Sequence, residues 1–177
     1  MANTGSASQR SIKNRVVSAI EGAGDLTEAV MNTVSATIME TLRGARGVGA
    51  EIGGLVVDTV TATIDGAAEV GGSISDAAKG AVIGVLRGTK DTDVSGLDAI
   101  TEVAKTVIRR TSDVGGDLAE AARGAIEGAV EGAREFGIDV GQATSAAATG
   151  AVDAATKISK SAATQVSAIV QGTVKGA

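Results

Sequence analysis

A short polar segment near the middle of the chain has the side-chain types and spacing of a cation-binding loop. Oxygen-bearing side chains stand at positions 1, 3, 5 and 12 of this segment, as Asp91, Asp93, Ser95 and Glu102, and Gly96 stands at position 6. An EF-hand calcium loop uses this spacing because a hard cation needs clustered oxygen ligands around a sharp turn. The segment is therefore a candidate calcium site.

The same segment also fits a simple helix-capping turn. Position 8 of an EF-hand loop is normally aliphatic, but here it is Asp98, and the sequence contains no second loop to pair with the first. Asp93 or Ser95 can instead cap a helix that follows. We favour the capping turn and predict no metal site.

Residues for other chemistry are scarce. The 177-residue sequence contains no His, Cys, Pro, Trp or Tyr. Its acidic residues are spread along polar helical faces, whereas general acid–base catalysis needs them paired in an apolar pocket. Glycine clusters such as residues 44–49 lack the Lys-Ser/Thr pair of a phosphate-binding loop. The sequence predicts a protein that is not an enzyme, with no catalytic residues and no cofactor.

An internal repeat organises the elements around this turn. Residues 71–88 (GGSISDAAKGAVIGVLRG) return 44 positions later as residues 115–132 (GGDLAEAARGAIEGAVEG). Weaker copies recur at offsets of 22 and 26, the latter between residues 33–38 and 59–64. Apolar residues follow spacings of three and four that repeat every 11 residues, about 3.67 residues per turn. These periods predict an all-α protein built on 11- and 22-residue repeats.

The Gly-Gly pairs within the repeats allow two arrangements. In one, they are turns followed by the N-caps Ser73 and Asp117, which gives a bundle of helices about 20 residues long. In the other, the helices continue through the glycines. The apolar stripe keeps its phase across the first pair, from Val70 to Ile74. We therefore predict an elongated antiparallel hairpin of two long Gly/Ala-rich helices.

This hairpin implies four segments. Residues 1–8 form a flexible N-terminal tail, residues 9–88 a first helical arm, residues 89–96 the turn and residues 97–177 a second helical arm. Two such slender arms would each leave an apolar strip uncovered, so the shape requires partners.

Small residues at helical spacing predict where the helices meet. They allow two backbones to approach closely. The predicted helix-packing interface comprises Gly80, Gly84, Gly88, Ala121, Gly124, Ala125, Gly128, Ala129 and Gly132. We expect a structural or scaffold protein that self-associates through these faces into an oligomeric bundle, tube or filament.

Composition narrows the alternatives. The net charge of −5 is well mixed, which argues against nucleic-acid binding, and Phe136 is the single aromatic residue. The 11- and 22-residue period is similar to that of exchangeable apolipoproteins, in period alone. A lipid-surface protein, or an oligomer that carries an apolar cargo such as a lipid or quinone for a membrane-associated complex, is therefore the alternative function. A positive mean hydropathy and 21% charged residues argue against a chain that stays disordered until dried or bound.

The sequence also bears on location. Its N-terminus lacks the apolar region of a secretory signal, and the absence of Cys fits a reducing compartment. The longest uncharged runs, residues 140–152 and 161–174, are shorter than the roughly 20 apolar residues of a membrane span. We expect a cytoplasmic protein.

Overall fold

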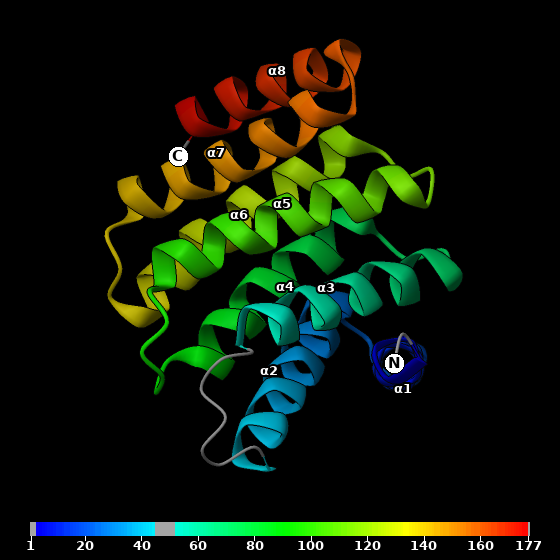
Figure 1. Ribbon diagram of the computed structural model, residues 1–177. Helices are drawn as coiled ribbons and strands as arrows, with labels where there is room; N and C mark the ends of the chain where they lie inside the picture. The colour runs from blue at the N-terminus through cyan, green and yellow to red at the C-terminus, as the bar shows by residue number, and fades with distance from the viewer. Residues whose placement is uncertain (1–2, 45–51, 177) are drawn as a thin grey trace.

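The chain folds into short helices joined by tight turns. The computed structural model describes residues 3–44 and 52–176, and within them it contains eight α-helices (Figure 1). They are α1 (Asn3–Gly22), α2 (Leu26–Gly44), α3 (Ile52–Glu69), α4 (Ile74–Thr89), α5 (Gly96–Asp113), α6 (Leu118–Phe136), α7 (Val140–Ile158) and α8 (Lys160–Gly176). None is longer than the 20 residues of α1.

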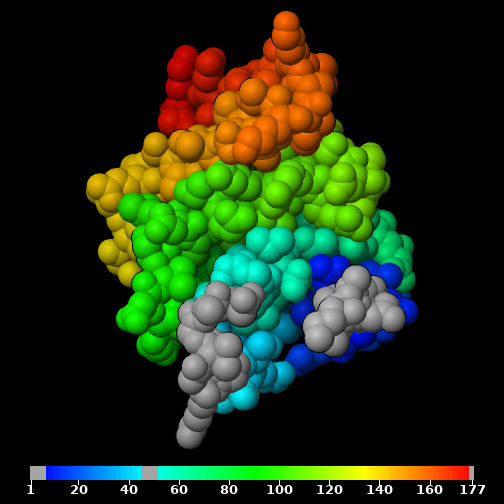
Figure 2. All heavy atoms as spheres, viewed as in Figure 1, coloured from blue at the N-terminus to red at the C-terminus, as the bar shows by residue number. Residues whose placement is uncertain are grey.

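The helices stack in two layers. One layer contains α1, α3, α5 and α7, and the other contains α2, α4, α6 and α8; each helix contacts the next helix in the chain and the next in its own layer. The chain therefore advances through the molecule one helix pair at a time, and Figures 1 and 2 show it as successive bands from blue to red. Stacking of similar helix pairs is how helical-repeat proteins build a continuous core.

Glycine reverses the chain between α3 and α4. Gly71 adopts a φ of 67°, a left-handed conformation that costs an L-residue about 1–2 kcal/mol but not glycine. The amide of Gly72 donates to the carbonyl of Ala67 at 2.8 Å, and the amide of Gly71 donates to that of Ala68 at 3.2 Å. This Schellman pattern satisfies the last carbonyls of α3. Ser73 then caps α4 by accepting a 3.1 Å hydrogen bond from an amide in its first turn.

The second Gly-Gly pair repeats the device 44 residues later. Gly115 has a φ of 72°, and the amide of Gly116 donates to the carbonyl of Thr111 at 2.8 Å. The carboxylate of Asp117 then caps α6, accepting hydrogen bonds from the amides of Ala119 and Glu120. One unit of the sequence repeat is thus one helix pair.

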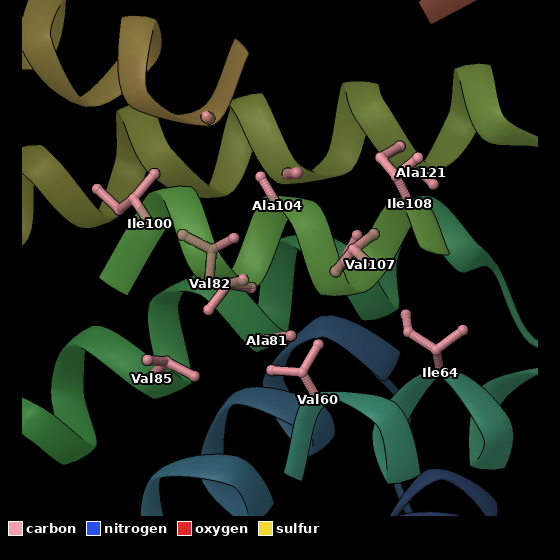
Figure 3. Close-up of a cluster of buried hydrophobic side chains, with 14 of the residues drawn as sticks. Val60, Ile64, Ala81, Val82, Val85, Ile100, Ala104, Val107, Ile108 and Ala121 are labelled. Atoms are coloured by element: carbon pink, nitrogen blue, oxygen red, sulfur yellow. The ribbon is translucent and has the colours of Figure 1, made fainter. Parts of the chain in front are cut away.

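The core lies between the two layers and is built from small aliphatic side chains. Figure 3 shows part of it, where Val60 and Ile64 of α3, Val82 of α4 and Val107 of α5 point toward one another; all four are fully buried. Burial of one such side chain stabilises the fold by about 1.5–3 kcal/mol before the entropy of ordering is subtracted. Phe136 is half-buried at the end of α6 and packs against this core.

The predicted hairpin of two long helices is wrong. The Gly-Gly pairs are turns that reverse the chain, so the arrangement found is a bundle of eight helices packed against one another. Continuous phase across these pairs does not report a continuous helix: Val70 lies in the turn that follows α3, whereas Ile74 begins α4 and packs against the core.

The four predicted segments map differently onto this bundle. Residues 3–8, expected in the tail, belong to α1, and residues 1–2 lie outside the described part. Residues 9–88 and 97–177 each contribute four helices instead of one arm. The turn at residues 89–96 exists, since α4 ends at Thr89 and α5 starts at Gly96, but it is one of several such turns.

Candidate interaction surfaces

Helices of the same layer touch through glycine. A Cβ placed on Gly128 of α6 would lie 2.7 Å from the carbonyl oxygen of Lys79 and 3.0 Å from the Cβ of Val82, both in α4. Real Cβ atoms do not come so close to a carbonyl oxygen, so only glycine permits this spacing of the two backbones. We call such a contact between neighbouring helices of one layer a joint.

The glycine–carbonyl contacts keep a constant sequence separation within each half of the chain. In the first half of the chain the paired residues are 53 apart, namely Gly66 with Lys13, Gly80 with Thr27, Gly84 with Met31 and Gly88 with Ser35. In the second half they are 49 apart, namely Gly124 with Ser75, Gly128 with Lys79 and Gly150 with Thr101. The difference of four residues, about one helical turn, matches the change between the 26- and 22-residue sequence offsets.

The residues of the predicted helix-packing interface lie inside the chain. Gly80, Gly84 and Gly88 of α4 face α2, and Gly124, Gly128 and Gly132 of α6 face α4. Ala121, Ala125 and Ala129 are fully buried beside them. The six glycines therefore join helices of one molecule and the three alanines are buried within it, so a surface for other molecules must be sought elsewhere.

Ion pairs bridge the same joints at their rims. Lys79 of α4 pairs with Glu131 of α6 at 2.8 Å, and Lys105 of α5 pairs with Asp153 of α7 at 3.5 Å. The hydrogen bond to Glu131 holds the pKa of Lys79 above its usual value. Hydrogen bonding to Lys157, reinforced by Lys105, lowers the pKa of Asp153. These acids and bases occupy exposed helix faces, where such pairs add little stability.

The outer side of the last helix pair repeats surfaces that are covered elsewhere in the stack. On α7, Ser145 and Ala148 stand 44 residues after Thr101 and Ala104, against which α7 itself packs. On α8, Ser167, Val170 and Val174 stand 88 residues after three α4 residues covered by α6, namely Lys79, Val82 and Leu86.

We call this outer side the C-terminal face. It comprises Ser145, Ala148, Val152, Ala163, Ser167, Val170 and Val174. Its side chains are half-buried or exposed, none carries a charge, and Val174 is 43% exposed. Among the described helices none follows α8 in the stack, and Val152 and Val170 pack against the core from the inner edge of this face. Sequence reasoning missed it, although shifting the repeat by 44 residues points to it.

The outer side of the first helix pair differs in chemistry. It forms an open groove of about 940 Å³ between α1 and α2, lined by Ala7, Arg10, Ser11, Asn14, Arg15, Ser18, Asn32, Thr33 and Ala36. Polar and charged side chains dominate this lining, and Arg15 pairs with Glu40 at 3.1 Å. Such a polar outer face is what the end of a helical stack needs in water.

The turn at residues 89–96 caps helices. Ser95 Oγ accepts a 3.5 Å hydrogen bond from the amide of Asp98 at the start of α5, and Thr92 Oγ1 donates to the carbonyl of Thr89 at 2.7 Å. Glu102 lies within α5, where its carboxylate is 3.9 Å from Arg109. Across residues 3–44 and 52–176, no three acidic side chains gather closely enough to hold a metal ion.

Two further findings bear on function. No helix within the described residues combines the length and apolar character needed to cross a membrane. The sequence matches no protein-family model and none of the curated proteins.

Proposed function

We propose that this protein is a non-enzymatic scaffold that associates with a second copy of itself through the C-terminal face. The observation that carries the proposal is that this face, made of Ala, Ser and Val, reproduces surfaces which the chain covers with its own helices at earlier joints. A helix pair from another molecule can cover it in the same way.

The contrast between the two outer sides supports a two-fold pair of copies. Surfaces that meet around a two-fold axis must be self-complementary, and the C-terminal face has no charged side chain to repel its own copy. The first helix pair instead presents Arg10, Asn14 and Arg15 to solvent. Head-to-tail growth into a filament would bury these polar and charged groups against an uncharged face, which is costly.

The non-enzymatic part of the proposal is supported by the placement of the ionisable residues. Within the described chain they lie at helix surfaces, many in ion pairs such as Lys79 with Glu131 and Arg87 with Glu135, both at 2.8 Å. The large grooves are open to solvent and are lined by side chains from adjoining helices. Rigid stacked helices that hold surfaces at fixed positions suit a scaffold.

Light scattering coupled to size-exclusion chromatography tests this proposal. Over a concentration series we expect a mass of twice the 17.2 kDa chain, with dissociation on dilution. Val170→Lys places a charge in the C-terminal face and should give a monomer. Ser11→Lys, on the outer side of α1, is the matched control and should leave the dimer intact.

Circular dichroism separates loss of association from loss of fold. The Val170→Lys variant should keep the helical signal of the parent, since this side chain is half-buried at an outer surface. A parent that is monomeric at every concentration contradicts the proposal, and so does a dimer that Val170→Lys leaves unchanged. An open-ended polymer that Ser11→Lys disrupts would show head-to-tail growth instead.

A further inference from the structure

The joint between α6 and α8 breaks the register that the other joints follow. A spacing of 49 residues would place Ala168 over the carbonyl of Ala119 and Gly172 over that of Arg123. Instead, a Cβ built on Gly172 would meet no atom within 4 Å, whereas one on Gly128, 44 residues earlier, would meet three within 3.1 Å. Ala168 and Gly172 are exposed, while their counterparts Gly124 and Gly128 are buried.

A groove occupies the place of the missing contacts. It has a volume of about 810 Å³, with Arg123, Glu127 and Val130 of α6 on one side and Ala168 and Gly172 of α8 on the other. The first half of α8 is seated, because Ala162 and Val166 are buried. Ile169 and Val170 still pack against the core, so the contact with α6 is lost on the side of α8 that carries Ala168 and Gly172.

Two differences in sequence explain why this joint stands open. Ala168 occupies the position of Gly124, whose added Cβ would lie 2.7 Å from the carbonyl carbon of Ser75. Lys175 occupies the position of Glu131 and Arg123 that of Lys79, so two bases replace the acid–base pair of the α4–α6 joint, and Arg123 pairs with Glu120 of its own helix at 3.3 Å. A methyl group and a like-charge pair replace a glycine and an ion pair.

We propose that α8 is a strap that swings about its seated first half and narrows the groove, bringing Gly172 toward the carbonyl of Arg123, while the methyl group of Ala168 keeps the two backbones further apart than those of α4 and α6. The link at one end of α8 suits such a hinge. Ser159 alone separates α7 from α8, in an extended conformation with a φ of −169° and a ψ of 164°, and its hydroxyl caps α8 through a 3.0 Å hydrogen bond from Ala162. The other end of the strap carries the glycine that closure requires.

Disulfide trapping tests closure, and the absence of Cys from the natural sequence makes an introduced pair unique. In the closed α4–α6 joint, a Cβ on Gly128 lies 3.1 Å from the Cα of Lys79. The equivalent pair Arg123→Cys/Gly172→Cys should then reach disulfide distance only when α8 closes. Arg123→Cys/Gln171→Cys is the matched control, because position 171 lies about 100° further round the helix.

Mild oxidation at low protein concentration should link the 123/172 pair within one chain at least tenfold faster than the 123/171 pair, as measured by peptide mapping. Equal rates for the two pairs, or bonds formed only between chains, would overturn the proposal. The substitution at Arg123 removes its charge, so this experiment reports the fit of the two backbones.

The charge contribution is tested in the Cys-free chain by amide hydrogen exchange along the second half of α8. Lys175→Glu restores the acid–base arrangement of the α4–α6 joint and should slow exchange several-fold. Gln171→Glu places the same charge near the same helix end, where an acid is unfavourable, and should hasten exchange. Faster exchange in both variants would show that an acid at position 175 does not stabilise α8 through contact with α6, and would contradict the strap.

Discussion

The α4–α6 joint and the α6–α8 joint are built from the same repeat but are packed differently. In the first, three glycines of α6 bring its backbone against α4, and ion pairs close the rim. In the second, the corresponding part of α8 stands away from α6 and leaves a groove. The comparison teaches that the shared repeat places two helices side by side, while single small residues and single charges decide how closely they pack.

The largest effect is expected where the closed joint is tightest. Gly124→Ala would push a methyl group into the backbone of Ser75 and force α4 and α6 apart. We expect the free energy of unfolding to fall by about 3 kcal/mol, the upper part of the range for overpacking. Because the chain has no Trp or Tyr, urea unfolding should be followed by far-ultraviolet circular dichroism. A loss below about 1 kcal/mol would mean that the joint yields easily.

The second-largest effects are expected from removal of the helix caps, which should act differently on α6 and α8. Asp117→Ala removes the acceptor for two amides at the start of α6 and should lower the free energy of unfolding by about 1 kcal/mol. Ser159→Ala removes the cap of α8. Its effect should appear as faster amide exchange confined to α8, since α8 is the less firmly packed helix. Equal exchange changes in α6 and α8 after Ser159→Ala would contradict this difference.

Gly172→Ala should have the opposite sign to Gly124→Ala. With no atom within 4 Å of the added Cβ, the methyl group meets no obstacle, and alanine favours the helix over glycine. We expect a gain of about 0.5 kcal/mol in the unfolding free energy. A clear loss would show that Gly172 already sits against α6 in solution.

The smallest effect concerns the rim charges. A double-mutant cycle of Lys79→Met and Glu131→Gln should give a favourable coupling of about 0.3 kcal/mol, as is usual for an exposed pair. The same cycle on Arg123 and Lys175 should give none or a slight repulsion. The pKa of Lys79 is raised in the folded state, so its contribution is complete below the unfolded value of 10.5 and is lost as pH rises through the folded value. Coupling that grows above that pH would contradict this assignment.

The all-α class and the repeat could be predicted from the sequence, because helical period and repeat length are local signals. Ser73 and Asp117 cap helices, as in the short-helix arrangement that we did not favour, and the difference of four residues between the offsets of 22 and 26 reappears between the contact registers of 49 and 53. The long hairpin was predicted wrongly because a left-handed glycine at position 71 or 115 reverses the chain, and sequence periodicity does not register that reversal.

It was harder to predict which helices pack against the glycine faces. A row of glycines such as Gly124, Gly128 and Gly132 indicates that another helix backbone packs closely there. It does not indicate whether that helix belongs to the same chain. In the structure the backbone belongs to the same chain, to residues 49 positions earlier. The sequence alone does not give this separation. The open α6–α8 joint depends on Ala168 and Lys175, whose meaning emerges only beside their equivalents Gly124 and Glu131.

The contact pattern of the stack also determines how the molecule would respond to a pulling force. Among the described helices, none touches a helix more than two places away along the chain. A load applied to the two ends therefore meets no contact between distant helices that would hold the whole stack together. The chain should lengthen in steps of about one helix pair. Refolding can begin at any pair and spread to its neighbours, which places this chain among fast-folding topologies of low contact order.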